Sequence, residues 1–243
     1  SRAPSWPAGR WHMCRMTIPE PEHLSDADLT AQGLRPAGQG RVLLLACGAL
    51  ARENLALVRL NGWDHMDLAC LPAILHNHPE KITDAVRAAV DKHRSDYARI
   101  CVVYADCGTG GLLQAACDEM GIEMVPGPHC YAFFDGLAEF ESRGEVTSFY
   151  LTDFLSRQFD AFVWRPLGLD RHPQLLEMYF GNYEKLVYLA QTDDPDLTAR
   201  AEAQAARLGL AFERRLTGYG DLARVLEGWA HQGAPGTGAL QNL

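Results

Sequence analysis

Four of the seven cysteines in this chain occur where a predicted strand gives way to a loop. They are Cys47 in VLLLACGAL, Cys70 in HMDLACLPA, Cys107 in ICVVYADCGTGG and Cys130 in MVPGPHCYAF. Neighbouring parallel strands end at one edge of a sheet, where open α/β sheets bind ligands, so these thiols are expected to gather there. His76, His78 and His129 lie in the same loops. Thiols with nearby imidazoles are typical of a soft-metal site.

The predicted metal ligands are three of these thiols and one further donor: Cys47, Cys107, Cys130 and His76, with Cys70 as the alternative to His76. Three protein ligands and an open position are the arrangement found in catalytic zinc sites, so the expected metal is zinc. An iron–sulfur cluster is the alternative, because four cysteine thiolates would satisfy it. The competing interpretation is that these cysteines are small core residues at strand ends.

Two further residues are predicted to be catalytic. His129 immediately precedes Cys130, and adjacent residues in extended backbone point in opposite directions, so His129 is expected to transfer protons rather than to bind the metal. Glu53 begins a predicted helix six residues after Cys47. It is a candidate base or metal ligand, although an acidic residue is also simply favourable in the first turn of a helix. Of His76 and His78, two positions apart, one is expected to face the site and the other solvent.

A glycine-rich turn follows the third predicted strand. Its backbone N–H groups, at the start of a helix, are expected to bind an anionic group of a substrate or cofactor through Gly108, Thr109, Gly110 and Gly111. The turn has neither the GxGxxG pattern nor a Walker lysine, so nucleotide binding is only weakly indicated. A tight turn without a ligand is the competing interpretation.

The elements that position these residues follow an alternating pattern. Strands are expected at 41–47, 65–73, 98–107, 122–127, 185–192 and 210–218. Helices are expected at 51–62, 79–94, 112–121, 128–143, 149–164, 172–185, 194–209 and 222–230. Strands separated by helices of this length indicate right-handed crossovers and a parallel sheet. The predicted fold is therefore α/β, a Rossmann-like, mostly parallel sheet with helices on both faces and a cysteine-lined site at the carboxyl ends of the strands.

Three regions are expected along the chain. Residues 1–40 form an extended or poorly ordered arm with a short helix capped by Ser25, residues 41–232 form an α/β metal-binding domain, and residues 233–243 form a flexible tail. Cys101 and Cys117 lie inside a predicted strand and a predicted helix, so both are expected to be buried apolar residues. Cys14, in the arm, has no context that would make it a ligand.

Composition excludes several classes of function. The formal net charge of −9 argues against nucleic-acid binding. No apolar run approaches the roughly 20 residues that span a bilayer, and the first residues lack the apolar segment of a signal peptide. A cytoplasmic location is therefore expected, in which the cysteines are thiols or ligands rather than disulfides.

The blocks LLACGALARE, LPAILHNHPEKI, VVYADCGTGG, GPHCYAFFDG, SFYLTDFLSRQF and YFGNYEKLVYLAQT resemble the domain-of-unknown-function 1638 family over about residues 41–230. Members of that family are often encoded near corrinoid-dependent methyltransferases and their reactivation proteins. The resemblance therefore implies corrinoid-dependent one-carbon metabolism, with the corrinoid carried by a partner protein or methyltransferase. It favours Cys47, Cys107, Cys130 and Glu53 over Cys70, and it transfers no established catalytic residue.

The expected function is a metal–thiolate protein, with transfer of a methyl group to the metal-bound thiol of a small substrate. One alternative is a non-catalytic accessory or reactivation partner of a corrinoid protein, anchored by aromatic side chains such as Phe133, Phe134, Tyr179 and Phe180. An iron–sulfur redox protein is the other.

Overall fold

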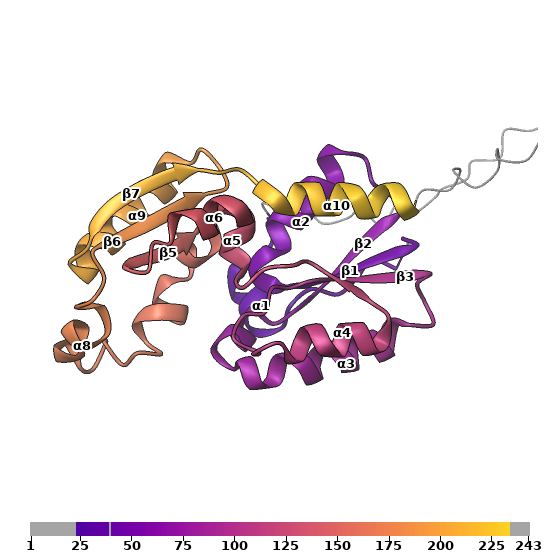
Figure 1. The fold of residues 1–243 in the computed structure, drawn as a ribbon, viewed down its shortest axis with the longest axis horizontal. Coiled ribbons are helices and arrows are strands. Elements are labelled where there is room, and N and C mark those ends of the chain that lie inside the picture. Colours follow the sequence, from indigo (N-terminus) through magenta and orange to yellow (C-terminus); the bar gives the residue numbers. More distant parts are fainter. Residues whose placement is uncertain (1–22, 39, 234–243) are drawn as a thin grey trace, which may run out of the picture.

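The first half of the chain builds a four-stranded parallel sheet, as the alternating pattern predicts. The computed structural model describes residues 23–38 and 40–233 (Figure 1). The strand order is β2-β1-β3-β4, and all three pairings are parallel. The strands are β1 (Val42–Cys47), β2 (Met66–Leu71), β3 (Arg99–Val103) and β4 (Glu123–Met124). Every residue of β1 is buried, as expected of a central strand covered on both faces.

Helices cover both faces of this sheet (Figure 1). They are α2 (Ala51–Leu60), α3 (Ile82–His93) and α4 (Leu112–Met120), joined by α10 (Gly220–Gly233) from the end of the chain. The short helix α1 (Asp26–Ala31) is capped by the Ser25 side chain, which accepts a hydrogen bond from the Asp28 amide, as predicted. Cys101 and Cys117 are fully buried, which confirms that they are core residues. Cys14 and the tail after residue 233 lie outside the described residues.

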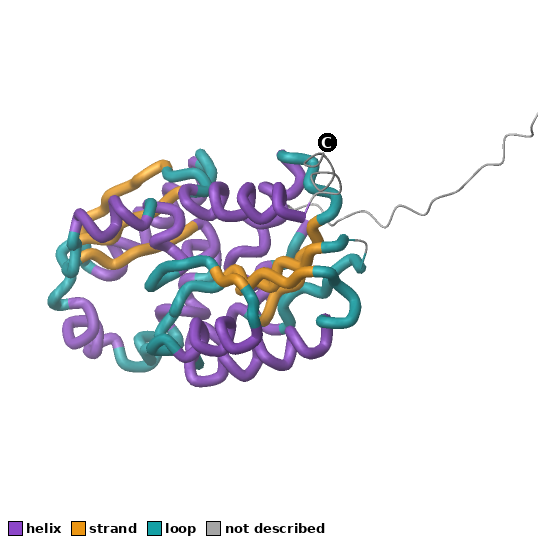
Figure 2. Tube along the Cα trace, turned by 45° about the vertical axis from the view of Figure 1, so that its right-hand side comes forward, coloured by secondary structure: helices purple, strands orange, loops and turns teal. Residues whose placement is uncertain are grey.

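The second half builds a separate three-stranded sheet in the order β5-β6-β7, again parallel. Its strands are β5 (Ser148–Thr152), β6 (Lys185–Ala190) and β7 (Ala211–Leu216), and α9 (Pro195–Leu208) packs on β6 and β7. The short helices α5 (Cys130–Asp135), α6 (Leu137–Arg143), α7 (Asp153–Arg157) and α8 (Leu176–Phe180) complete this half, seen from a second side in Figure 2.

The predicted helix over 149–164 is wrong in its first part. Residues 148–152 form β5, because the β-branched and aromatic side chains of SFYLT suit a pleated, largely buried strand. Thr152 then caps α7 by accepting a hydrogen bond from the Leu155 amide, and a π-helical turn follows at Asp160–Trp164. The sequence of an aromatic-rich segment of this kind fits a strand and a helix about equally well. Here Thr152 marks the boundary, because it ends β5 and caps α7.

Helix α10 returns from the second sheet to the first (Figure 1). Its Trp229 donates from Nε1 to Glu123 at 2.8 Å, and Arg99 donates to the Trp229 carbonyl at 3.3 Å. His65 lies 3.1 Å from the carbonyl of Ala230. The last helix therefore ties the two halves of the molecule together.

The carboxyl ends of the two sheets approach each other. A pocket of about 400 Å³ is lined by Arg52 and Glu53, which follow β1, and by Asp153 and Gln191, which follow β5 and β6. Asp153 is almost fully buried and accepts hydrogen bonds from the Tyr188 hydroxyl and from Thr192. This is the region in which parallel sheets bind ligands, and here residues from both sheets line one cavity.

Candidate functional site

Two of the predicted ligands, Cys107 and Cys130, are in direct contact. The amides of Asp106 and Cys107 donate to the carbonyls of Gly127 and Pro128 at 3.0 Å, which continues the β3–β4 pairing beyond the strands. This pairing brings Cys107 to the start of α5, where its Sγ lies 3.3 Å from the Sγ of Cys130. Cys107 has a φ of 48°, and no other described non-glycine residue has a positive φ. Such strain is concentrated at functional sites, where the surrounding structure maintains it.

The contact gives the two thiols different acidities. The hydrogen bond from Cys130 lowers the pKa of Cys107 to about 5, against the opposing effect of burial, and His76 lowers it further. The same contact, with burial, raises the pKa of Cys130 well above its usual value. At neutral pH the pair therefore holds one thiolate, on Cys107, and one proton, on Cys130. A thiolate is the nucleophilic and metal-binding form of cysteine.

Cys47 and Cys70 lie behind this pair as neutral thiols. Burial raises the pKa of Cys47 to about 12 and that of Cys70 well above its usual value. The charge of Cys107 further raises the pKa of Cys47. Burial raises the pKa of Tyr104 most, and the charges of all four cysteines raise it further, so the four thiols lie near this residue. We call Tyr104 and these four cysteines the thiol site.

Tyr104 is a residue that the sequence reasoning missed. It is 2% exposed, and its hydroxyl has no hydrogen-bond partner of normal geometry within residues 23–38 and 40–233. Burial raises the pKa of the neighbouring Cys47 thiol, and a side-chain interaction with Tyr104 opposes that rise. The signal in the sequence was a phenol at the end of an otherwise apolar strand, three residues before Cys107.

His76 and His78 are both exposed but have different neighbours. His76, in the 3₁₀ turn Ala73–Asn77, lies close enough to Cys107 to lower the pKa of that thiol. His78 is half exposed and lies 3.5 Å from Glu80 on the surface. His76 itself is exposed and packs edge-on against Phe162. The thiol site therefore has an imidazole on its solvent side.

His129 lies at the N-terminus of α5, beside Cys130. Partial burial lowers its pKa, against the opposing charge of Cys107, so its ring is neutral at neutral pH and can accept a proton. The ring stacks on Tyr131 with a centroid distance of 4.9 Å, and Tyr131 stacks in turn on Tyr150 at 5.1 Å. This stack forms part of the wall of a pocket of about 410 Å³.

Glu53 faces the pocket between the two sheets. It is 4% exposed, and its Oε2 has no hydrogen-bond partner in the described part of the chain. Burial raises its pKa to about 7, despite the nearby Arg157 and Arg52. Its charge also raises the pKa of Cys47 and Cys70. Glu53 thus has the acidity of a general acid or base at neutral pH, between the thiol site and this pocket.

The glycine-rich turn is held by Asp106. Its carboxylate accepts hydrogen bonds from the Thr109 hydroxyl at 2.8 Å, from the Gly110 amide at 3.2 Å and from the Gly111 amide at 2.6 Å. Gly108, Gly110 and Gly111 all have positive φ. The Thr109 amide donates to the Asp106 carbonyl at 2.9 Å, so three of the four amides predicted to bind an anion already have an acceptor within the chain. Gly108 and Thr109 also line a groove between α3 and α4, of about 730 Å³.

The donor set has the chemistry of a soft-metal site, but the structure brings only part of it together. Thiolate and imidazole are ligands that suit zinc. Within the described residues, no three His, Cys, Asp or Glu side chains are close enough to hold a metal ion. The contact between Cys107 and Cys130 is thus the part of the predicted ligand set that is assembled.

Comparison with known proteins places these residues in a family. A family model described as protein of unknown function (DUF1638) matches residues 70–226. Cys107, Cys130, His76 and His129 lie inside the matched residues, whereas Cys47 and Glu53 precede them. No curated protein and no solved structure matches the chain. None of the helices among the described residues has the length and apolar character needed to cross a membrane. Because the match covers more than half of its length, the chain belongs to the DUF1638 family.

Proposed function

We propose that the thiol site is a metal–thiolate centre in which Cys107 supplies the thiolate. The observation that supports this most directly is the 3.3 Å contact between the Sγ atoms of Cys107 and Cys130. The hydrogen bond from Cys130 and the nearby His76 both lower the pKa of the Cys107 thiol. Cys130 is the second ligand of the proposal, and Cys47 and His76 are the further donors. Zinc is the proposed metal, because it accepts mixed thiolate and imidazole ligands; an iron–sulfur cluster on the four cysteines is the alternative.

Each residue near the thiol site has its own role in this proposal. Cys107 is ionised before any ligand binds, so little proton release is needed at this position. Cys130 must lose its proton on metal binding, and His129, the preceding residue, whose ring is neutral, is the proposed acceptor. Tyr104, which is buried and interacts with the Cys47 side chain, can donate a hydrogen bond to a thiolate of the site. Zinc, when bound, would hold a substrate thiol as its thiolate, the form that accepts a methyl group.

The family resemblance supplies the biochemical setting of the proposal. A methyl-corrinoid on a partner protein is the proposed methyl donor, and a small thiol is the proposed acceptor. Glu53 and the pocket between the sheets are the proposed place for the polar part of that substrate. The accessory alternative is weakened at its proposed anchors, because Phe133, Phe134 and Phe180 are buried in the core, which leaves Tyr179 exposed.

The experiment is elemental analysis of the full chain purified without oxygen. The proposal predicts about one zinc per chain, lost in Cys107→Ser and Cys130→Ser but retained in Cys117→Ser. Cys117 is the matched control because it is a buried cysteine on α4 that takes no part in the thiol site. A wild-type chain without metal, or zinc that survives Cys107→Ser, contradicts the proposal. Turnover of methylcobalamin with a small thiol then separates an enzyme from an accessory protein.

A redox dithiol is the second candidate function. Two sulfurs at 3.3 Å, one of them a thiolate, need only a small movement to form a disulfide, whose S–S bond is about 2.05 Å long. Titration of free thiols before and after mild oxidation tests this candidate. The loss of two thiols in the wild type, and of none in Cys130→Ser, would favour it if the purified protein holds no metal.

A further inference from the structure

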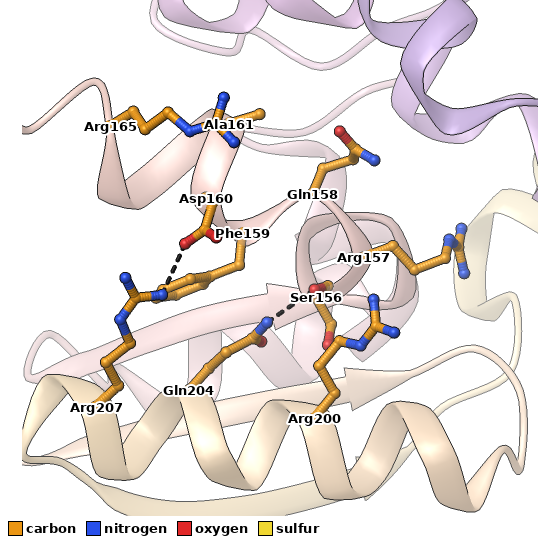
Figure 3. A pocket seen from close by; sticks show the side chains of 10 residues that line it. All are labelled: Ser156, Arg157, Gln158, Phe159, Asp160, Ala161, Arg165, Arg200, Gln204 and Arg207. Atoms are coloured by element: carbon orange, nitrogen blue, oxygen red, sulfur yellow. Dashed lines mark hydrogen bonds and ion pairs between the residues drawn. The ribbon is translucent and has the colours of Figure 1, made fainter. Parts of the chain in front are cut away.

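A further pocket, far along the chain from the thiol site, has four arginines among the residues that line it (Figure 3). It has a volume of about 350 Å³, within the range of small-molecule sites. One wall is α9, whose Arg200, Gln204 and Arg207 recur at helical spacing and so share a face. The facing wall is residues 156–161 with Arg165 (Figure 3). Four arginines and one carboxylate line the pocket of a chain whose formal net charge is −9. We call it the arginine pocket.

The two walls are held in a fixed relation. Gln204 donates from Nε2 to the carbonyl of Ser156 at 2.8 Å, and Arg207 pairs with Asp160 at 2.7 Å. The Arg207 guanidinium also lies 3.5 Å from the centroid of the Trp164 ring, a cation–π contact. Asp160 and Trp164 begin and end the π-helical turn, a conformation that is rare and frequently found at functional sites. Arg207 is therefore occupied in holding the pocket together.

The other three arginines, Arg157, Arg165 and Arg200, have N–H groups without an acceptor in the described part of the chain. The side chains of Arg165 and Arg200 form neither an ion pair nor a hydrogen bond with any part of the chain that the structure describes. Arg157 pairs with Asp26 through Nε at 2.8 Å, but its Nη2 is buried without a partner. These cationic groups around one cavity favour an anion with several acceptor oxygens, because guanidinium groups match such oxygens in geometry and charge.

Buried polar atoms at the base of the pocket point to the same kind of ligand. Ser156 is 1% exposed, and its hydroxyl has no hydrogen-bond partner in residues 23–38 and 40–233. The Oε1 atom of Gln204, a residue that is 9% exposed, is likewise unpartnered. The serine can donate to an anion and the glutamine can accept from a hydroxyl. Buried polar groups normally have hydrogen-bond partners, so a bound ligand would supply the partners that these two side chains lack.

We propose that the arginine pocket binds the phosphate group of a small phosphate ester that carries a free hydroxyl. Arg200 and Arg165 supply the charge, Ser156 and Arg157 donate to phosphate oxygens from the buried side, and Gln204 accepts from the ester's hydroxyl. The site is formed by α7, the π-helical turn and α9, and none of its residues belongs to the thiol site. Arg157 also lines the pocket between the sheets, whereas Arg165, Arg200 and Ser156 do not. Substitution of these three residues therefore tests the proposal independently of the metal–thiolate centre.

The test is calorimetric titration of the full chain with glycerol 3-phosphate, inorganic phosphate and citrate at constant ionic strength. We expect one site for glycerol 3-phosphate, weaker binding of inorganic phosphate, and no saturable binding of citrate. Arg200→Gln and Arg165→Gln should each weaken glycerol 3-phosphate about tenfold or more, since each removes a charged hydrogen bond. Ser156→Ala should weaken it without loss of thermal stability, because its hydroxyl has no partner to lose.

Arg171→Gln is the matched control, since Arg171 is an exposed arginine outside the pocket, 3.8 Å from Asp170. Its affinity for glycerol 3-phosphate should equal that of the wild type. The proposal is overturned if the wild type does not bind glycerol 3-phosphate, if Arg200→Gln and Arg165→Gln bind it unchanged, or if Arg171→Gln weakens it equally. Citrate binding as tight as that of glycerol 3-phosphate also overturns it, because the pocket would then select charge rather than phosphate.

Discussion

At the scale of single residues, the chemistry of this protein depends on how burial and contact divide protons among similar groups. Cys107 and Cys130 are identical side chains, yet one is held as a thiolate and the other as a thiol because they share a hydrogen bond. Glu53 and Asp153 are both buried carboxylates, but Asp153 has several hydrogen-bond donors whereas Oε2 of Glu53 has none. Neighbours, rather than residue type, thus decide which group is reactive.

The thiolate of Cys107 should depend on Cys130. In the wild type, the absorbance of thiolate should rise with a midpoint near pH 5, since the Cys130 hydrogen bond lowers the pKa of Cys107. Cys130→Ala removes that bond, so the midpoint should move upward by at least about one pH unit. Ultraviolet titration of the metal-free protein measures it, and Cys117→Ala should leave the curve unchanged. A midpoint that stays near pH 5 in Cys130→Ala would show that another group ionises Cys107.

Glu53 should make the protein less stable as pH rises. Its pKa in the folded protein is about 7, above the value of 4.5 for a free side chain, so its contribution is fully present below pH 4.5 and is lost as pH rises through 7. Glu53→Gln should therefore be more stable than the wild type at pH 8 by roughly 2–3 kcal/mol, and the difference should shrink toward pH 5. Urea unfolding at both values measures this, with Glu202→Gln on the exposed face of α9 as control. Equal differences at pH 5 and pH 8 would contradict the account.

Among the helices and strands, the sequence predicts those whose apolar residues follow a repeated pattern. It does not predict features that depend on one contact between distant residues. The aliphatic runs of β1 and β3 and the amphipathic α3 predict their own structure. Of the four thiols expected to meet at the strand ends, the structure brings Cys107 and Cys130 into direct contact. The strand β5 was wrongly predicted as helix, because the aromatic side chains of this segment do not recur with the period of either a strand or a helix. The contact of Cys107 with Cys130 depends on backbone pairing of residues 106 and 107 with 127 and 128, which no local pattern reveals.

Asp106 should control the loop that carries Cys107. Asp106→Ala removes an acceptor of the Thr109 hydroxyl and of the Gly110 and Gly111 amides, which should cost about 1–3 kcal/mol in the free energy of unfolding. Asp106→Asn keeps one carbonyl oxygen and should cost less. Chemical denaturation measures both, and Asp91→Ala, on the exposed side of α3, should have little effect. Full stability of Asp106→Ala would mean that the turn does not need this carboxylate.

At the scale of the whole molecule, two parallel sheets present their carboxyl ends to one pocket, and α10 joins them. This arrangement could not be predicted from the alternation of strands and helices, because the same alternation would also suit one continuous sheet. What separates the sheets is the segment from α5 to α6, which packs against α10 and β5 instead of returning to β4. The thiol site belongs to the first sheet, the arginine pocket to the second, and Glu53 to the region between them.

Trp229 should contribute strongly to the packing of α10, the helix that joins the two halves of the molecule. Its side chain is 5% exposed, and its Nε1 donates to Glu123. Trp229→Ala should lower the free energy of unfolding by about 3–5 kcal/mol, as large core truncations do, whereas Trp229→Phe, which mainly loses the hydrogen bond, should cost about 0.5–2 kcal/mol. Urea unfolding followed by circular dichroism distinguishes the two. A cost below about 1 kcal/mol for Trp229→Ala would mean that α10 is dispensable.

The central claim, that Cys107 and Cys130 bind one soft metal ion together, is tested most directly by replacing the metal with cobalt(II). A cobalt ion held by thiolates absorbs through sulfur-to-metal charge transfer, and the absorbance grows with the number of thiolates. This absorption should be present in the wild type and in Cys117→Ser, weaker in Cys130→Ser and absent from Cys107→Ser. A wild-type spectrum without the band, or a band that Cys107→Ser leaves intact, would contradict the central claim.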